Sequence, residues 1–122
     1  MKHLVWLPLL MLAAVATTGC GRGKASPQIA AEQLQKSYAK ADAPSREGVA
    51  QVATALQSGD YTRAIVTMDR VAQAKPVDPA QKKAVGTLIR QTRLAVQQNP
   101  KLNTPELYKA MSDLVLRVHG EN

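Results

Sequence analysis

The chain of 122 residues contains no phenylalanine, one tryptophan and three tyrosines. Its core must therefore be built from alanine, valine, leucine, isoleucine and methionine, which favours helices packed through small side chains over an aromatic-rich β-sandwich. A single cysteine excludes a disulfide within the chain. Zinc sites need several cysteines or histidines at set spacings, and these are lacking. We predict no metal site and no cofactor.

Catalytic groups are equally scarce. The chain has two histidines, and the one beyond the N-terminal apolar run, His119, lies three residues from the end, where a helix frays. The nine carboxylates are scattered, and no glycine-rich loop stands between a strand and a helix to bind phosphate. We identify no catalytic residue and expect a protein that is not an enzyme. No aromatic residues alternate with the cations, so we expect no nucleic-acid partner.

The N-terminus has the layout of a secretory signal. Met1, Lys2 and His3 precede an uncharged run from Leu4 to Ala16. This run falls short of the roughly 20 apolar residues that a membrane span requires. The tripeptide "AVA" at 14–16 fits cleavage by ordinary signal peptidase after Ala16, which would release a soluble periplasmic protein.

A second cleavage pattern follows at once. The tetrapeptide "TTGC", which is Thr17, Thr18, Gly19 and Cys20, resembles the lipobox of bacterial lipoproteins. The resemblance implies a signal peptide at 1–19, lipidation of Cys20, and a flexible tether over 20–26. It also implies a protein anchored by its lipid in the cell envelope. Glycine at position 21, in place of aspartate, implies the outer membrane, on its periplasmic face. The two cleavage sites remain alternatives.

Prolines divide the remainder into periodic segments, and none falls inside one. We predict an all-α domain over 27–122 with about five antiparallel helices, because apolar residues recur at helical spacing and no segment alternates with period two. The predicted helices are 27–41, 44–58, 61–75, 79–98 and 105–119. The predicted caps are Ser26, Asp60, Asp78 with Gln81, Thr104 and, at the C-terminus, Gly120. The residues predicted to face inward are Ile29, Leu34, Tyr38, Ala41, Val49, Val52, Ala53, Leu56, Tyr61, Ala64, Ile65, Met68, Val71, Ala72, Val85, Leu88, Ile89, Thr92, Val96, Leu107, Met111, Leu114, Val115 and Val118.

The segment "GDYTRAIVTMDRVAQAKP", residues 59–76, resembles the tetratricopeptide repeat, a pair of antiparallel helices. The residues that carry the resemblance are Gly59, Asp60, Tyr61, Ala64, Met68, Val71 and Pro76. It implies a helical hairpin over about 45–78. Val85, Gly86 and Ile89 also fit the opening of a following repeat. A compact bundle of the same helices is the alternative.

Charge is distributed unevenly along this chain of net charge +7, because no acidic residue occurs between Asp78 and Glu106. Within this stretch Lys82, Lys83, Arg90 and Arg93 fall in an arc of about 100° on the predicted helix, beside its apolar stripe. This basic ridge could flank a groove between helices and bind an anionic partner, or it could be a solvated face.

Together these features predict a membrane-anchored envelope lipoprotein whose helical domain is a non-catalytic module that binds another envelope protein. The alternative is a cationic protein that binds anionic envelope polymers or lipids through the basic ridge at 82–93.

Overall fold

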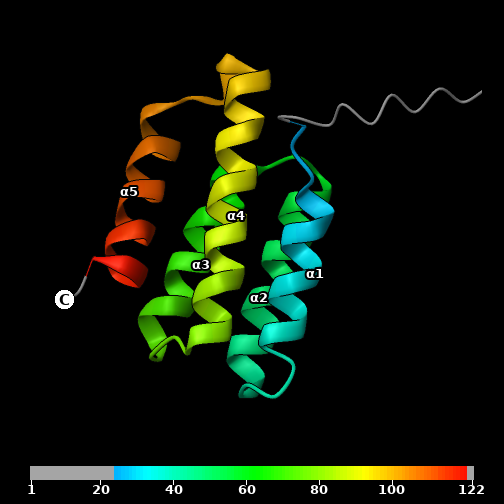
Figure 1. Ribbon diagram of the computed structural model, residues 1–122, viewed down its shortest axis with the longest axis vertical. Coiled ribbons are helices and arrows are strands. Elements are labelled where there is room, and N and C mark those ends of the chain that lie inside the picture. Colours follow the sequence, from blue (N-terminus) through cyan, green and yellow to red (C-terminus); the bar gives the residue numbers. More distant parts are fainter. Residues whose placement is uncertain (1–23, 121–122) are drawn as a thin grey trace, which may run out of the picture.

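A computed structural model describes residues 24–120, and this part is all-helical. The helices are α1 (Pro27–Ser37), α2 (Ala43–Gln57), α3 (Tyr61–Ala74), α4 (Pro79–Gln98), a short 3₁₀ helix η1 (Pro100–Leu102) and α5 (Pro105–His119) (Figure 1). The predicted all-α domain of five helices is confirmed for the described residues. The predicted signal peptide, lipobox and lipidation site lie outside them.

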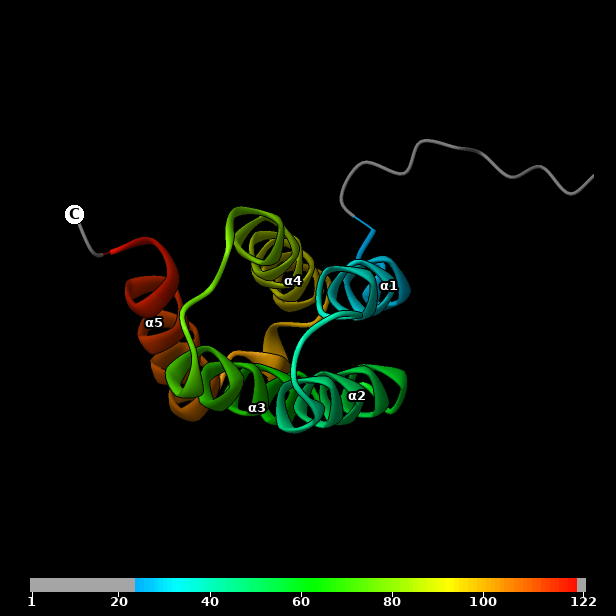
Figure 2. The ribbon, with the colours of Figure 1, turned by 90° about the horizontal axis from the view of Figure 1, so that it is seen from below.

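Seen along the helix axes, the five helices follow one another around a ring in the order α1, α2, α3, α5 and α4 (Figure 2). Helix α2 packs between α1 and α3, α5 packs against α3, and α4 packs against α1. Helices α4 and α5 meet only sparsely, so the ring is least closed between them. The most deeply buried large side chains are Leu34, Val49, Val52, Leu56, Ile65, Met68, Val85, Leu88, Thr92, Leu107 and Leu114.

Local sequence signals set most helix ends. The Asp60 carboxylate accepts a hydrogen bond from the Arg63 N–H, as the predicted cap requires. Asp78 and Gln81 form the predicted capping box at the start of α4, with Asp78 accepting from the Gln81 N–H at 2.7 Å. The hydroxyl of Thr104 caps α5 in the same way.

The first helix departs from the prediction in three ways. It ends at Ser37 instead of 41, because α2 begins at Ala43 and the reversal of the chain must be built before its cap position, Asp42. Ser26 occupies the N-cap position, but its side chain makes no capping hydrogen bond. Ile29 was predicted to face inward and is 45% exposed. The face centred on Ala30 and Leu34 is buried instead, since α1 is covered by both α2 and α4.

The hairpin predicted over 45–78 is present as α2 and α3. Gly59 joins the two helices with a φ of 75°, a left-handed conformation that glycine adopts at little cost. The Gly59 N–H donates to the Leu56 carbonyl and the Asp60 N–H donates to the Ala55 carbonyl. These two bonds are the Schellman pattern that ends a helix. Asp60 is also the N-cap of α3, so one tight turn both ends α2 and caps α3.

The repeat pattern does not continue into α4. A second repeat would stack α4 on the α2–α3 hairpin, whereas α4 packs mainly against α1. Gly86, which fits the small position in the opening of a following repeat, has open space at its side-chain position, where an added Cβ would meet no atom within 4 Å. The five helices therefore form a bundle in which α2 and α3 make a hairpin.

Candidate functional site

Polar contacts hold α4 against α1 and against the two residues that precede α1. The buried Gln91 side chain accepts a hydrogen bond from the Ser26 N–H at 2.6 Å, and Gln98 accepts from the Ala25 N–H at 3.4 Å. Halfway along α4, the Thr87 hydroxyl donates to the Gln33 side chain at 2.7 Å. These bonds fix the start of the described chain at the C-terminal end of α4.

Helix α5 is held against α3, on the other side of the ring. Arg117 Nε of α5 forms an ion pair with Asp69 Oδ1 of α3 at 2.7 Å. Both side chains are largely shielded, since Arg117 is 34% and Asp69 is 20% exposed. Leu107, Leu114 and Val118 are buried on α5, which packs against α3. Each of α4 and α5 is thus attached to a different neighbour, and a groove remains between them.

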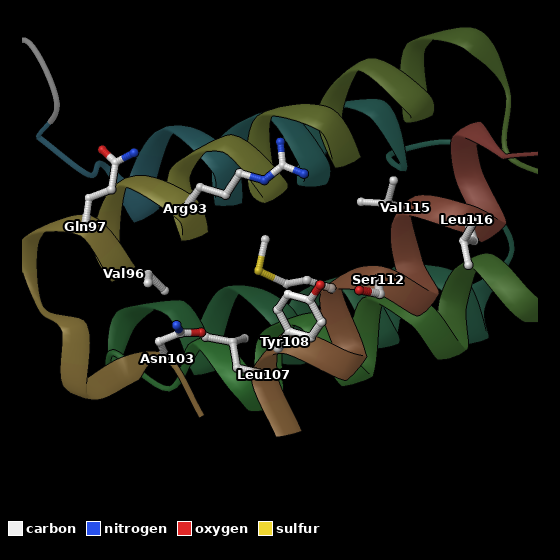
Figure 3. A pocket seen from close by; sticks show the side chains of 10 residues that line it. Arg93, Val96, Gln97, Asn103, Leu107, Tyr108, Ser112, Val115 and Leu116 are labelled. Atoms are coloured by element: carbon white, nitrogen blue, oxygen red, sulfur yellow. The ribbon is translucent and has the colours of Figure 1, made fainter. Parts of the chain in front are cut away.

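This α4–α5 groove has a volume of about 630 Å³ and is open to solvent. Arg93, Val96 and Gln97 come from the α4 wall, and Tyr108 and Ser112 come from the α5 wall (Figure 3). Gln97 and Asn103 lie at one end and Leu116 lies at the other (Figure 3). The full lining consists of Arg93, Val96, Gln97, Asn103, Leu107, Tyr108, Met111, Ser112, Val115 and Leu116.

The groove exposes apolar side chains that a closed bundle would bury. Tyr108 is 69% exposed and Leu116 is 64% exposed, and both line the groove. Val96, Met111 and Val115 are half-buried, although all three were predicted to face inward. An isolated exposed leucine is ordinary; here two exposed and three half-buried apolar residues line the same groove.

Only one of the four cations of the basic ridge lines the groove. All four cations are exposed, and within residues 24–120 none of them forms an ion pair. Arg93 lines the α4–α5 groove, as a ridge flanking a groove requires. Lys82, Lys83 and Arg90 lie outside the groove lining, on the solvated side of α4.

Most of the residues that resemble the tetratricopeptide repeat are buried in the packing of the domain. Tyr61, Ala64, Met68 and Val71 are buried between helices, and Pro76 is exposed in the loop after α3. Helices α2 and α3 approach closely at Gly48, where an added Cβ would lie 2.5 Å from Val71 Cγ2. These residues build the domain and do not form a ligand-binding face.

Four titratable groups within residues 24–120 have shifted pKa values, and they are Tyr38, Asp42, Tyr61 and Lys109. Burial, and then the nearby charge of Asp78, raises the pKa of Tyr38 to about 12. The hydrogen bond from Ser45, followed by the ion pair with Lys75, lowers the pKa of Asp42. Tyr38 and Asp42 lie where α1 passes to α2, and neither borders the groove. His119 is exposed in the last turn of α5.

Among the described residues, no group of three or more histidine, cysteine, aspartate or glutamate side chains is placed to hold a metal ion. In the same part of the chain, no helix combines the length and apolar character needed to cross a bilayer.

Sequence reasoning allowed for a groove beside the basic ridge, but it did not identify the α5 wall. The inward residues predicted on the last helix, together with Tyr108, cover an arc of about 120°. This is the width of an ordinary core-facing stripe, so the sequence does not show that part of it lines a groove.

Comparison of the chain with protein-family models, with curated proteins and with solved structures yields no match.

Proposed function

We propose that this protein is a lipoprotein of the bacterial cell envelope that binds another envelope protein through the α4–α5 groove. The observation that carries the protein-binding role is the exposure of Tyr108 and Leu116 in a groove that also contains Met111 and Val115. Tyrosine and methionine are enriched at protein interfaces, and methionine adapts to the shape of a partner.

The lipid anchor is supported by the lipobox-like "TTGC" at 17–20 after an apolar run. The structure adds a geometric bound to this proposal. The Ala25 N–H donates to the Gln98 side chain of α4, and the five Cα–Cα steps from Cys20 to Ala25 span at most about 18 Å. A lipid on Cys20 would therefore keep the domain next to the membrane surface, with the C-terminal end of α4 and η1 nearest to it. We infer attachment to the periplasmic face of the outer membrane.

Intact mass of the protein extracted from membranes tests the anchor. We expect the mass of residues 20–122 with a diacylglyceryl group and an amide-linked acyl chain. The Cys20→Ser variant should lack this lipid and leave the membrane fraction. A mature N-terminus at Thr17 in the wild-type protein would instead mean cleavage after Ala16 and a soluble periplasmic protein.

Cross-linking in the native envelope tests the protein-binding role. Lys109 on α5, with 79% of its side chain exposed, offers an amine next to the groove residue Tyr108. An amine-reactive cross-linker should produce a product that contains this chain and a second, different protein. Recovery of the monomer alone would refute the role.

The alternative proposal, binding of anionic envelope polymers or lipids, is supported by the four exposed cations of the basic ridge. Replacing Lys82, Lys83, Arg90 and Arg93 together by glutamine should then weaken binding to phosphatidylglycerol vesicles and flatten its salt dependence. Unchanged vesicle binding would rule this alternative out.

A further inference from the structure

The α4–α5 groove is long enough on its α5 side to accept one additional helix. Tyr108, Met111 and Val115 stand at i, i+3 and i+7 on α5, so they form one continuous row along the groove. Arg93, Val96 and Gln97 face this row from α4 over about one helical turn. The lining of α5 from Leu107 to Leu116 is about 14 Å long at 1.5 Å per residue. The α5 wall is therefore long enough for two to three turns of an added helix, which would contact α4 over about one turn.

The openness of the groove favours a macromolecule over a small ligand. Pockets for small molecules enclose most of the ligand surface. Here Tyr108 and Leu116 stay more than 60% exposed at the rim. A helix with an apolar stripe would cover these rims and the half-buried Val96 and Met111 below them at the same time.

Charge distinguishes the two sides of the groove. On the α4 side, Arg93 is exposed and makes no ion pair with any residue of 24–120. On the α5 side the lining contains no charged residue, and Lys109, which lies outside the lining, pairs with Asp113 at 2.8 Å. A partner would therefore gain attraction from carboxylates placed along its α4-facing edge, and little from charges along its other edge.

The same charge argument disfavours two occupants from this chain. A second copy paired groove to groove would bring its own Arg93 to the groove in place of a carboxylate. The apolar run from Leu4 to Ala16 carries no acidic residue and so offers Arg93 no counter-charge.

We propose that the α4–α5 groove binds an amphipathic helix of another protein, with its apolar stripe against Tyr108, Met111 and Val115 and acidic residues beside Arg93. This inference rests on the proposed protein-binding role and specifies the chemistry of the partner.

Site-specific photo-cross-linking of the full chain in its native envelope tests the proposal. Tyr108→p-benzoylphenylalanine places the reactive group in the groove, and Gln73→p-benzoylphenylalanine, at an exposed position of α3, is the matched control. We expect a protein adduct from position 108 and none from 73. Mass spectrometry of the adduct should locate the cross-link in a segment with apolar residues at helical spacing and aspartate or glutamate along one flank.

Charge reversal tests the role of Arg93. Arg93→Glu should lower the yield of the position-108 adduct about fivefold or more. Lys83→Glu makes the same charge change on the same helix, outside the groove, and should leave the yield within about twofold. Both positions are exposed, and circular dichroism of the variants verifies the fold.

Each other outcome has a defined meaning. An adduct with lipid, with residues 4–16 or with a second copy overturns the helix proposal. A protein adduct in a segment without acidic residues, or equal yields for Arg93→Glu and Lys83→Glu, overturns it while leaving protein binding intact. No adduct from position 108, with a heteromeric product still formed by the amine cross-linker, places the partner elsewhere on the domain.

Discussion

Helices α2 and α3 approach closely at Gly48. We predict that the change in stability caused by Gly48→Ala depends on one neighbouring side chain, Val71. A Cβ added at Gly48 would lie 2.5 Å from Val71 Cγ2, much closer than van der Waals contact. Val71 is buried, and its β-branched side chain has one strongly preferred rotamer in a helix. Gly48→Ala therefore forces the two helices apart or Val71 out of its rotamer.

The magnitude follows from two opposing terms. Overpacking of this kind costs about 1–3 kcal/mol, whereas alanine in a helix interior is about 1 kcal/mol better than glycine. Gly48→Ala should therefore lower the free energy of unfolding by about 0–2 kcal/mol. In a Val71→Ala background the clashing methyl group is absent, and the same change should raise the free energy of unfolding by about 1 kcal/mol.

Equilibrium unfolding in urea, followed by circular dichroism, measures the four free energies of this double-mutant cycle. We expect a coupling energy of about 1–3 kcal/mol between positions 48 and 71. Gly86→Ala is the matched control, because it is the same substitution in a helix with no atom within 4 Å of the added Cβ. It should stabilise the protein by about 1 kcal/mol in either background. Equal effects of Gly48→Ala in both backgrounds would refute the close approach of the two helices.

Three further predictions concern the turns and the titration of the domain. Gly59→Ala should destabilise the protein by about 1–2 kcal/mol in urea unfolding, because its φ of 75° is strained for residues with a side chain, and Gly59→Asn should cost less. Asp78→Ala should lower the free energy of unfolding by about 1 kcal/mol, because the capping box is lost. Asp78→Asn should keep the cap but remove the negative charge near Tyr38, so the pKa of Tyr38 in an absorbance titration of the phenolate should fall. The raised pKa of Tyr38 means that the folded state favours the protonated phenol, so the free energy of unfolding should fall as pH rises from 10 to about 12. If a Tyr38→Phe variant lost stability equally over this range, the loss could not be assigned to ionisation of Tyr38.

Local rules of sequence were sufficient for the helices and for one hairpin. Proline occupies the first position of α1, α4 and α5, where its missing N–H costs nothing. The caps at Asp60, Asp78 and Thr104 use side chains within three residues of the backbone group that they satisfy. The turn at Gly59 needs only the conformational freedom of glycine. Such signals act over a few residues, and a single sequence displays them directly.

The first helix shows where local rules end. Its apolar pattern continues to Ala41, so sequence periodicity alone extends the helix past Ser37. The exposure of Ile29 likewise depends on which neighbours cover α1, because two helices pack against the side of Ala30 and Leu34. Periodicity identifies an apolar face but not the partner that buries it.

The sequence by itself determined the helical class, most of the helix boundaries, the α2–α3 hairpin and the presence of an acid-free segment with four cations. Only the tertiary structure decided that α4 packs on α1 and α5 on α3. Those choices depend on contacts between residues far apart in the chain, such as Gln91 with Ser26 and Arg117 with Asp69. They leave Tyr108 and Leu116 uncovered and bring Arg93 beside them. The α4–α5 groove exists because neither helix buries the other, and a pattern confined to one helix cannot show that.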